Sequence, residues 1–219
     1  AGGHNDLMTD VTTLARGRVT ESELEVRRSR FITRLARVTD EDAAREVVAA
    51  ARADFPDARH HCSAFIVRVP GANLVERSSD DGEPAGTAGM PMLEVLRGSG
   101  LVDVAAVVIR YFGGIKLGTG GLVRAYSDAV RDALSRAPVV REQTTALHAV
   151  SLPHAVAGRV ESELRDQGFV VDDVSYAEQV ILTLATNDDA ALASAVASLT
   201  GAEPHLRPAG TRVVELPTG

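Results

Sequence analysis

Cysteine and long apolar runs are nearly missing from this sequence. Cys62 is the only cysteine among 219 residues, so no disulfide can form within the chain and no cysteine-held iron–sulfur cluster can assemble. No segment approaches the roughly 20 apolar residues of a membrane helix, and the polar N-terminus lacks a signal-peptide core. We therefore expect a cytoplasmic protein without membrane association.

A metal-binding motif is also missing. Asp80, Asp81 and Glu83 stand close together, but they lack the longer ligand spacing of a calcium loop, and Asp-Gly and Glu-Pro are turn dipeptides. The histidines beyond residue 140 are too dispersed for a local zinc site. We predict no metal and no cofactor. Cys62 adjoins two histidines, which leaves a catalytic thiol as an alternative, although we favour an ordinary buried cysteine.

Negative charge is concentrated in the C-terminal part of the chain. The net charge is −7, and residues 139–219 hold five arginines and eleven acidic residues, a balance of −6. Residues 1–138 hold 18 basic and 19 acidic residues and are nearly neutral. The N-terminal part can therefore carry a basic surface in spite of the overall charge.

The sequence from residue 104 to 134 predicts a strand, a glycine-rich loop and a helix. Val104–Ile109 is a short apolar run rich in β-branched residues, which suits a strand buried on both faces. Apolar residues recur at helical spacing after the second glycine pair. Glycine-rich backbone followed by a helix N-terminus favours an anion, and no acidic residue lies between Val104 and Ser127.

Candidate anion- or nucleic-acid-binding residues follow from this pattern. They are the positively charged residues, the glycines and one upstream histidine: His60, Arg110, Gly113, Gly114, Lys116, Gly118, Gly120, Gly121 and Arg124. The spacing fits neither a nucleotide P-loop nor the dinucleotide-binding fingerprint. The alternative is that the glycines only permit a tight turn and close helix packing.

Two long motifs resemble the signature of the IMPACT (YigZ-type) family. The first runs from Asp81 to Pro91, and the second runs from Arg110 to Ser127. The segments beginning at Ser29 and Ala58 agree with the family pattern, although some relatives have asparagine where His61 stands. The resemblance adds further candidate residues from the first motif: Asp81, Gly82, Glu83, Pro84, Gly86 and Thr87.

The resemblance implies an α+β protein of two domains. Relatives pair an N-terminal two-layer α/β domain, like the second domain of ribosomal protein S-five, with a small ferredoxin-like domain. The same two folds occur together in elongation factor G, which suggests a role linked to translation by fold analogy. Eukaryotic relatives have an additional N-terminal RWD domain for a partner that this chain is not expected to share, so we expect the bacterial two-domain form.

The strand and helix pattern restarts near Pro138. We predict a flexible leader over residues 1–18, an IMPACT-type N-terminal domain over 19–138 and a ferredoxin-like domain over 139–219. In the last of these, alternating and helical periodicities follow the order β-α-β-β-α-β. The expected strands are 146–152, 169–176, 179–185 and 211–216.

Two functions remain open from the sequence. We favour a non-enzymatic regulatory protein linked to translation, which binds RNA, the ribosome or a translation factor through the glycine-rich basic loop. The alternative is an enzyme that acts on a phosphorylated or other anionic small molecule, with His60, Asp81 or Glu83 as acid or base. No nucleophile, base and orienting residue stand at a diagnostic spacing, so the catalytic residues stay unassigned.

Overall fold

A computed structural model describes residues 11–218 of the chain. The chain divides into two compact units, one formed by Val11–Arg141 with the residues from Leu216 onward, and the other by Glu142–Glu215. The boundary lies after Arg141, inside a strand, whereas the sequence suggested a boundary near Pro138. Each unit has its own hydrophobic core and its own antiparallel sheet, as the α+β prediction requires. The described residues include no helix that is long and apolar enough to cross a membrane.

A five-stranded antiparallel sheet forms the centre of the N-terminal unit. Its strands lie in the order β2-β3-β6-β4-β5, and their bounds are Val19–Val26, Ser29–Arg37, Val104–Tyr111, His60–Val67 and Val75–Ser79. The central strand β6 is the apolar run predicted to be buried on both faces. All of its residues except Tyr111 are buried.

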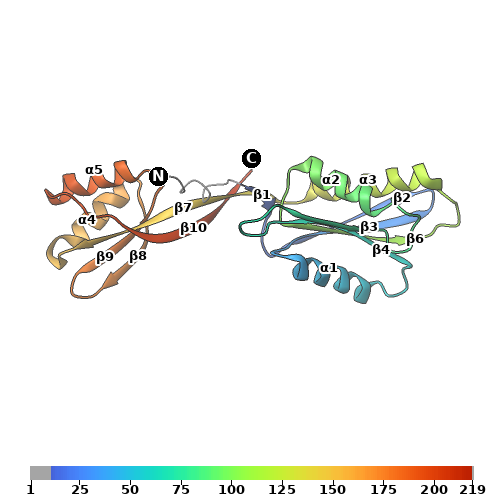
Figure 1. Ribbon diagram of the computed structural model, residues 1–219, viewed down its shortest axis with the longest axis horizontal. Coiled ribbons are helices and arrows are strands. Elements are labelled where there is room, and N and C mark those ends of the chain that lie inside the picture. Colours follow the sequence, from blue (N-terminus) through green and yellow to red (C-terminus); the bar gives the residue numbers. More distant parts are fainter. Residues whose placement is uncertain (1–10, 219) are drawn as a thin grey trace. The chain divides into compact units, whose positions relative to one another are not determined.

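Helices cover both faces of this sheet (Figure 1). α2 (Gly89–Ser99) and α3 (Gly118–Arg136) pack on one face, where Met92, Leu96 and Tyr126 join the largest core cluster. α1 (Glu41–Asp54) packs on the other face and adds a third layer to the two layers expected. The α1 helix begins after Asp40, whose carboxylate accepts a hydrogen bond from the Ala43 backbone N–H at 2.8 Å.

The C-terminal unit has the predicted β-α-β-β-α-β order. Its sheet has the strand order β10-β7-β9-β8, with the helices packed on one side of the core. The elements are β7 Val139–Leu152, α4 His154–Asp166, β8 Val170–Tyr176, β9 Val180–Ala185, α5 Asp189–Thr200 and β10 Arg207–Pro217. β7 is longer than its predicted segment, and it also pairs with the short strand β1 (Val11–Leu14).

The prediction of a flexible leader is wrong for residues 11–18. β1 lies in this segment, and its Thr13 and Leu14 are buried. Two backbone hydrogen bonds hold the segment, from Ala15 N–H to the Pro138 carbonyl at 2.9 Å and from Val102 N–H to the Thr12 carbonyl at 3.1 Å. The segment reads Val-Thr-Thr-Leu and does not alternate between apolar and polar residues, so tertiary pairing decides this strand. The rest of the predicted leader, residues 1–10, lies outside the described residues.

Candidate functional site

The turn between β5 and α2 is closed by the carboxylate of Asp80. Its two oxygens accept backbone hydrogen bonds from Gly86 at 2.7 Å, Ala88 at 3.0 Å and Gly89 at 2.8 Å. Asp80 therefore satisfies N–H groups at the start of α2 that would otherwise have no partner. Burial raises the pKa of the Asp80 carboxyl, but the three N–H donors outweigh burial and the pKa lies below its ordinary value.

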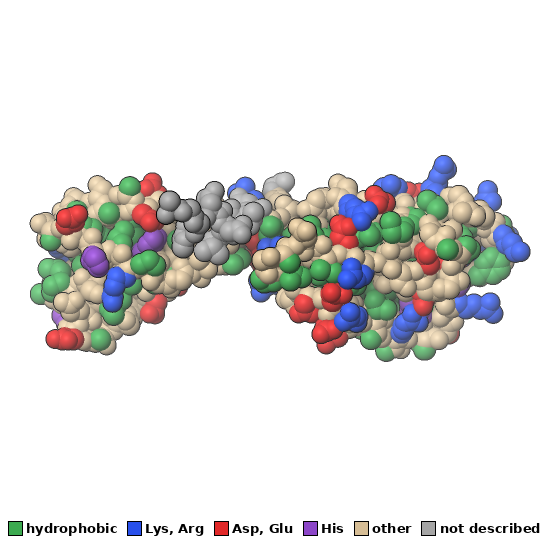
Figure 2. All heavy atoms as spheres, viewed as in Figure 1, with side chains coloured by type: hydrophobic (Ala, Val, Ile, Leu, Met, Phe, Trp, Pro, Cys, Tyr) green, Lys and Arg blue, Asp and Glu red, His purple; other side chains and the backbone are tan. Residues whose placement is uncertain are grey.

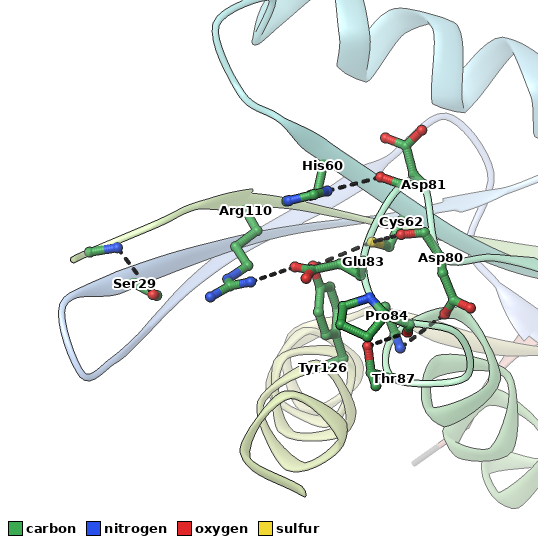
Figure 3. A network of polar contacts seen from close by, with 12 residues as sticks. Ser29, His60, Cys62, Asp80, Asp81, Glu83, Pro84, Thr87, Arg110 and Tyr126 are labelled. Atoms are coloured by element: carbon green, nitrogen blue, oxygen red, sulfur yellow. Dashed lines mark hydrogen bonds and ion pairs between the residues drawn. The ribbon is translucent and has the colours of Figure 1, made fainter. Parts of the chain in front are cut away.

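Asp81 ties this turn to the start of β4 and the end of α1. Its carboxylate accepts hydrogen bonds from the His61 backbone N–H at 2.6 Å and from Arg52 at 2.5 Å. Its backbone carbonyl lies 2.9 Å from Nδ1 of His60 (Figure 3). A carbonyl only accepts hydrogen bonds, so neutral His60 carries its proton on Nδ1 and leaves Nε2 as an acceptor. Asp81 has a structural role here, which weakens the hypothesis that it is an acid or base.

Glu83 is the centre of a buried polar network that joins three elements (Figure 3). Its Oε1 accepts hydrogen bonds from Arg110 at 2.6 Å and from the Tyr126 hydroxyl at 2.7 Å. The Cys62 thiol donates to the same hydroxyl at 3.3 Å. Burial raises the pKa of Cys62 to about 12, which contradicts a reactive thiol and agrees with an ordinary buried cysteine.

Arg110 projects from the end of β6 between two aromatic rings. Its guanidinium carbon lies 5.5 Å from the ring centroid of Phe31 and 5.8 Å from that of Phe112. The side chain is 93% buried and its Nε atom has no hydrogen-bond partner within the described part of the chain. A buried guanidinium nitrogen without a partner is costly, and a bound acceptor would satisfy it.

The loop after β6 is positioned by its first glycine pair. A Cβ atom at Gly113 would lie 2.0 Å from the backbone of Arg28, so only glycine fits there, and its N–H donates to Ser29 Oγ at 3.2 Å. Gly114 has a φ of +86°, in the left-handed region that favours glycine. The remaining glycines of the motif lie in the first turn of α3 rather than in the loop, because this helix begins at Gly118.

The N-terminus of α3 is open to a ligand. No side chain caps it, and its first turn contains no acidic residue. Its unpaired backbone N–H groups and the helix dipole favour an anion at this end. In Figure 2 the charged side chains at this end of the N-terminal unit, where Figure 1 places the turn between β6 and α3, are mainly blue Lys and Arg, with green hydrophobic side chains beside them.

A pocket of about 670 Å³ lies at this helix end. It brings together six of the predicted residues, namely His60, Glu83, Pro84, Arg110, Lys116 and Gly118. Three basic residues and two acidic residues line it, but both acids are engaged: Glu83 binds Arg110, and Asp57 accepts a hydrogen bond from the Tyr111 hydroxyl. Lys116 and Arg59 form no ion pair within residues 11–218. The pocket therefore presents net positive charge to a ligand.

The other predicted residues do not line this pocket. Gly113, Gly114, Gly120 and Gly121 shape the loop and the helix, while Asp81, Gly82, Gly86 and Thr87 form the turn before α2. Arg124 is exposed on α3 but lies outside the pocket lining. The sequence reasoning missed Arg59 and Phe112, although both stand inside the motifs that resemble the family.

Metal coordination and a second groove are less promising as functional sites. Within residues 11–218 there is no group of three or more His, Cys, Asp or Glu side chains that could hold a metal ion.

A larger groove of about 860 Å³ lies between α2 and α3, and its lining is mostly apolar and small, with Glu94 and Arg131 as its charged residues. The pocket at the α3 N-terminus is therefore the candidate site.

Comparison with known proteins covers both domains. Residues 27–134 match the Impact N-terminal domain family, and residues 150–203 match a domain family of unknown function, DUF1949. The chain is 42% identical over 161 residues to the IMPACT family member YvyE of Bacillus subtilis, and the match covers 73% of each chain. The chain belongs to the IMPACT family.

Other members of the IMPACT family show the same similarity. The chain is 52% identical over 118 residues to the IMPACT family member YigZ of Escherichia coli, covering 54% of this chain and 58% of YigZ. A crystal structure described as that of an hypothetical protein matches 91% of this chain and 97% of its own, with 36% identity and a TM-score of 0.59. The two-domain translational regulator Yih1 matches 62% of this chain with 27% identity, but its TM-score of 0.39 is too low to support a shared fold.

Proposed function

We propose that this IMPACT family protein binds RNA of the translation apparatus, and that it holds a phosphate group in the pocket at the α3 N-terminus. The observation that carries the proposal is the unpaired positive charge in this pocket. Arg59 and Lys116 have no ion-pair partner within residues 11–218, and the buried Arg110 has an unsatisfied Nε beside an uncapped helix end. Phosphate oxygens match all of these donors.

The link to translation rests on the family resemblance and on fold analogy. The two folds predicted from the motifs occur together in elongation factor G, which acts on the ribosome. Ribosomes are cytoplasmic, so the proposal also requires a cytoplasmic location. A protein translation factor is the other partner considered, but it would not need a pocket with spare donors for an oxyanion.

Charge-reversal variants test the phosphate contact. We expect Lys116→Glu to weaken binding to ribosomes and to a ribosomal RNA stem-loop by about tenfold or more. The slope of log affinity against log salt concentration should also become shallower, by the equivalent of about one or two phosphate contacts. Arg124→Glu is the control, because it makes the same charge change on the exposed surface of α3, outside the pocket. Equal loss in both variants would indicate a diffuse electrostatic surface and would refute the pocket.

Lys116 also offers a direct spectroscopic probe, since it is the only lysine in the chain. Reductive methylation with ¹³C-formaldehyde labels its amine and the chain N-terminus, which give separate signals. RNA or inorganic phosphate that binds the pocket should shift the Lys116 signal and leave the N-terminal signal unchanged. A Lys116 signal that stays unchanged at saturating RNA would contradict the proposal.

A second function is favoured by the orientation of His60. Its Nδ1 is held by the Asp81 carbonyl (Figure 3), which leaves Nε2 as a proton acceptor on a residue that lines the same pocket as Arg110. A base and a cation in one pocket suit an enzyme acting on a phosphorylated small molecule. Thermal-shift screening of phosphorylated metabolites distinguishes this function. An enzyme should be stabilised by a small molecule, and ribosomal RNA should not compete for the site that this molecule occupies.

A further inference from the structure

The pocket contains an exposed aromatic ring that the phosphate contact does not use. Phe112 follows β6 directly, lines the pocket and is 58% exposed. Single exposed apolar residues are common on protein surfaces, so exposure alone carries no meaning. The surroundings of Phe112 distinguish it, because both its backbone and one face of its ring are held in place.

Two contacts fix the ring. The Arg110 guanidinium lies over it at 5.8 Å from the centroid, and that guanidinium is itself held by Glu83 at 2.6 Å. Gly113, the next residue, packs against the Arg28 backbone and donates to Ser29 Oγ. Because Phe112 is more than half exposed, the ring face away from Arg110 is open. A flat apolar surface is thus preorganised at the edge of a positively charged pocket.

We infer that the pocket takes one unpaired nucleotide of RNA, with its phosphate at Lys116 and the α3 N-terminus and its base stacked on the open face of Phe112. The inference rests on the proposed function and specifies its ligand. A volume of about 670 Å³ lies within the range of small-molecule sites, about 300–1,000 Å³, so it admits a nucleotide and not a duplex.

Stacking requires a single-stranded ligand. In a duplex each base is already stacked on its neighbours. The base edges of A-form RNA lie either in the deep, narrow major groove or in the wide, shallow minor groove. Proteins that bind single strands combine a basic surface with aromatic rings in the same way. His60 adds a polar contact, since its Nε2 can accept a hydrogen bond from a ribose 2′-OH or a base amino group.

The test separates the base from the phosphates. Wild-type protein is titrated with an eight-nucleotide oligoadenylate and with an abasic strand of the same length and charge. We expect the oligoadenylate to bind more tightly, and Phe112→Ala to weaken its binding by about tenfold to a hundredfold while binding of the abasic strand stays unchanged. Phe112→Tyr should keep wild-type affinity. Tyr176→Ala is the control, because it removes another exposed aromatic ring, in the C-terminal unit.

Each other outcome has a distinct meaning. If the wild type binds both strands equally, or if Phe112→Ala binds oligoadenylate as well as the wild type, base stacking is refuted and phosphate binding stands. Equal weakening of both strands in Phe112→Ala also refutes stacking, because the ring would then act only by positioning Arg110. If the wild type binds neither strand, nor ribosomal RNA, the proposed function itself fails.

Discussion

The buried pair of Glu83 and Arg110 should dominate the stability of the N-terminal unit. The two side chains are 4% and 7% exposed, and the Glu83 oxygen that accepts from Arg110 also accepts from Tyr126. Glu83→Gln keeps the shape but makes the Tyr126 hydrogen bond a neutral one, removes the negative charge from the Arg110 hydrogen bond and so leaves a buried guanidinium without a counter-charge. Removing one partner of a buried pair costs about 3–5 kcal/mol, so we expect a loss of about 3 kcal/mol.

A double-mutant cycle checks this magnitude. Arg110→Met should cost a similar amount on its own, because Glu83 is then left buried and unpaired. In the double variant neither charge remains, so the combined loss should fall short of the sum by about 2 kcal/mol or more. Glu161→Gln is the control, since its ion pair with Arg165 is solvent-exposed and should matter by less than about 0.5 kcal/mol.

Urea unfolding followed by far-UV circular dichroism is the appropriate assay, because the chain contains no tryptophan for fluorescence. The two compact units can unfold separately, so amide hydrogen exchange of β6 assigns the transition to the N-terminal unit. Losses that add within about 0.5 kcal/mol in the double variant would refute coupling between the two charges. The hydrogen bond between Glu83 and Arg110 would then contribute no measurable coupling energy.

Three further predictions follow from the same region. Gly114→Ala should destabilise the protein by about 1 kcal/mol, because the φ of Gly114 is +86°. Gly120 lies inside α3 with open space around it, so Gly120→Ala should be neutral or slightly stabilising. Equal unfolding midpoints for the two variants would contradict this prediction. Cys62 should react with a thiol reagent at pH 8 only as the protein unfolds, since a pKa of about 12 leaves a thiolate fraction of about 10⁻⁴. Rapid labelling of the folded protein would show instead that the thiol is accessible. The pKa of Asp80 is lowered in the folded state, so its carboxylate stabilises the protein above the unfolded-state pKa of about 3.9, and this contribution is lost as the pH falls through the lower folded-state pKa. The stability deficit of Asp80→Asn, measured by urea unfolding, should therefore be constant from about pH 5 to 8 and shrink below about pH 4, and a deficit that grows with acid would show the opposite sign.

The sequence by itself determined the order of elements and the family. Helical and alternating periodicities are local properties, so the β-α-β-β-α-β pattern of the C-terminal unit and the buried central strand β6 could be predicted from short windows. The two long motifs were sufficient for the family, which comparison confirms. The glycine pair before α3 marked the loop for the same reason, because glycine is required where the backbone turns sharply.

Tertiary structure alone decided which of these residues meet. Glu83 lies 27 residues from Arg110 and 43 from Tyr126 along the chain, and their contacts depend on how the turn before α2 and the helix α3 pack at the end of β6. The same packing makes Glu83 a buried partner instead of a free acid, and leaves Arg124 on the exposed side of the helix that carries Gly118 into the pocket. Such contacts depend on loop closure and on the direction of each side chain, and no local sequence pattern contains either.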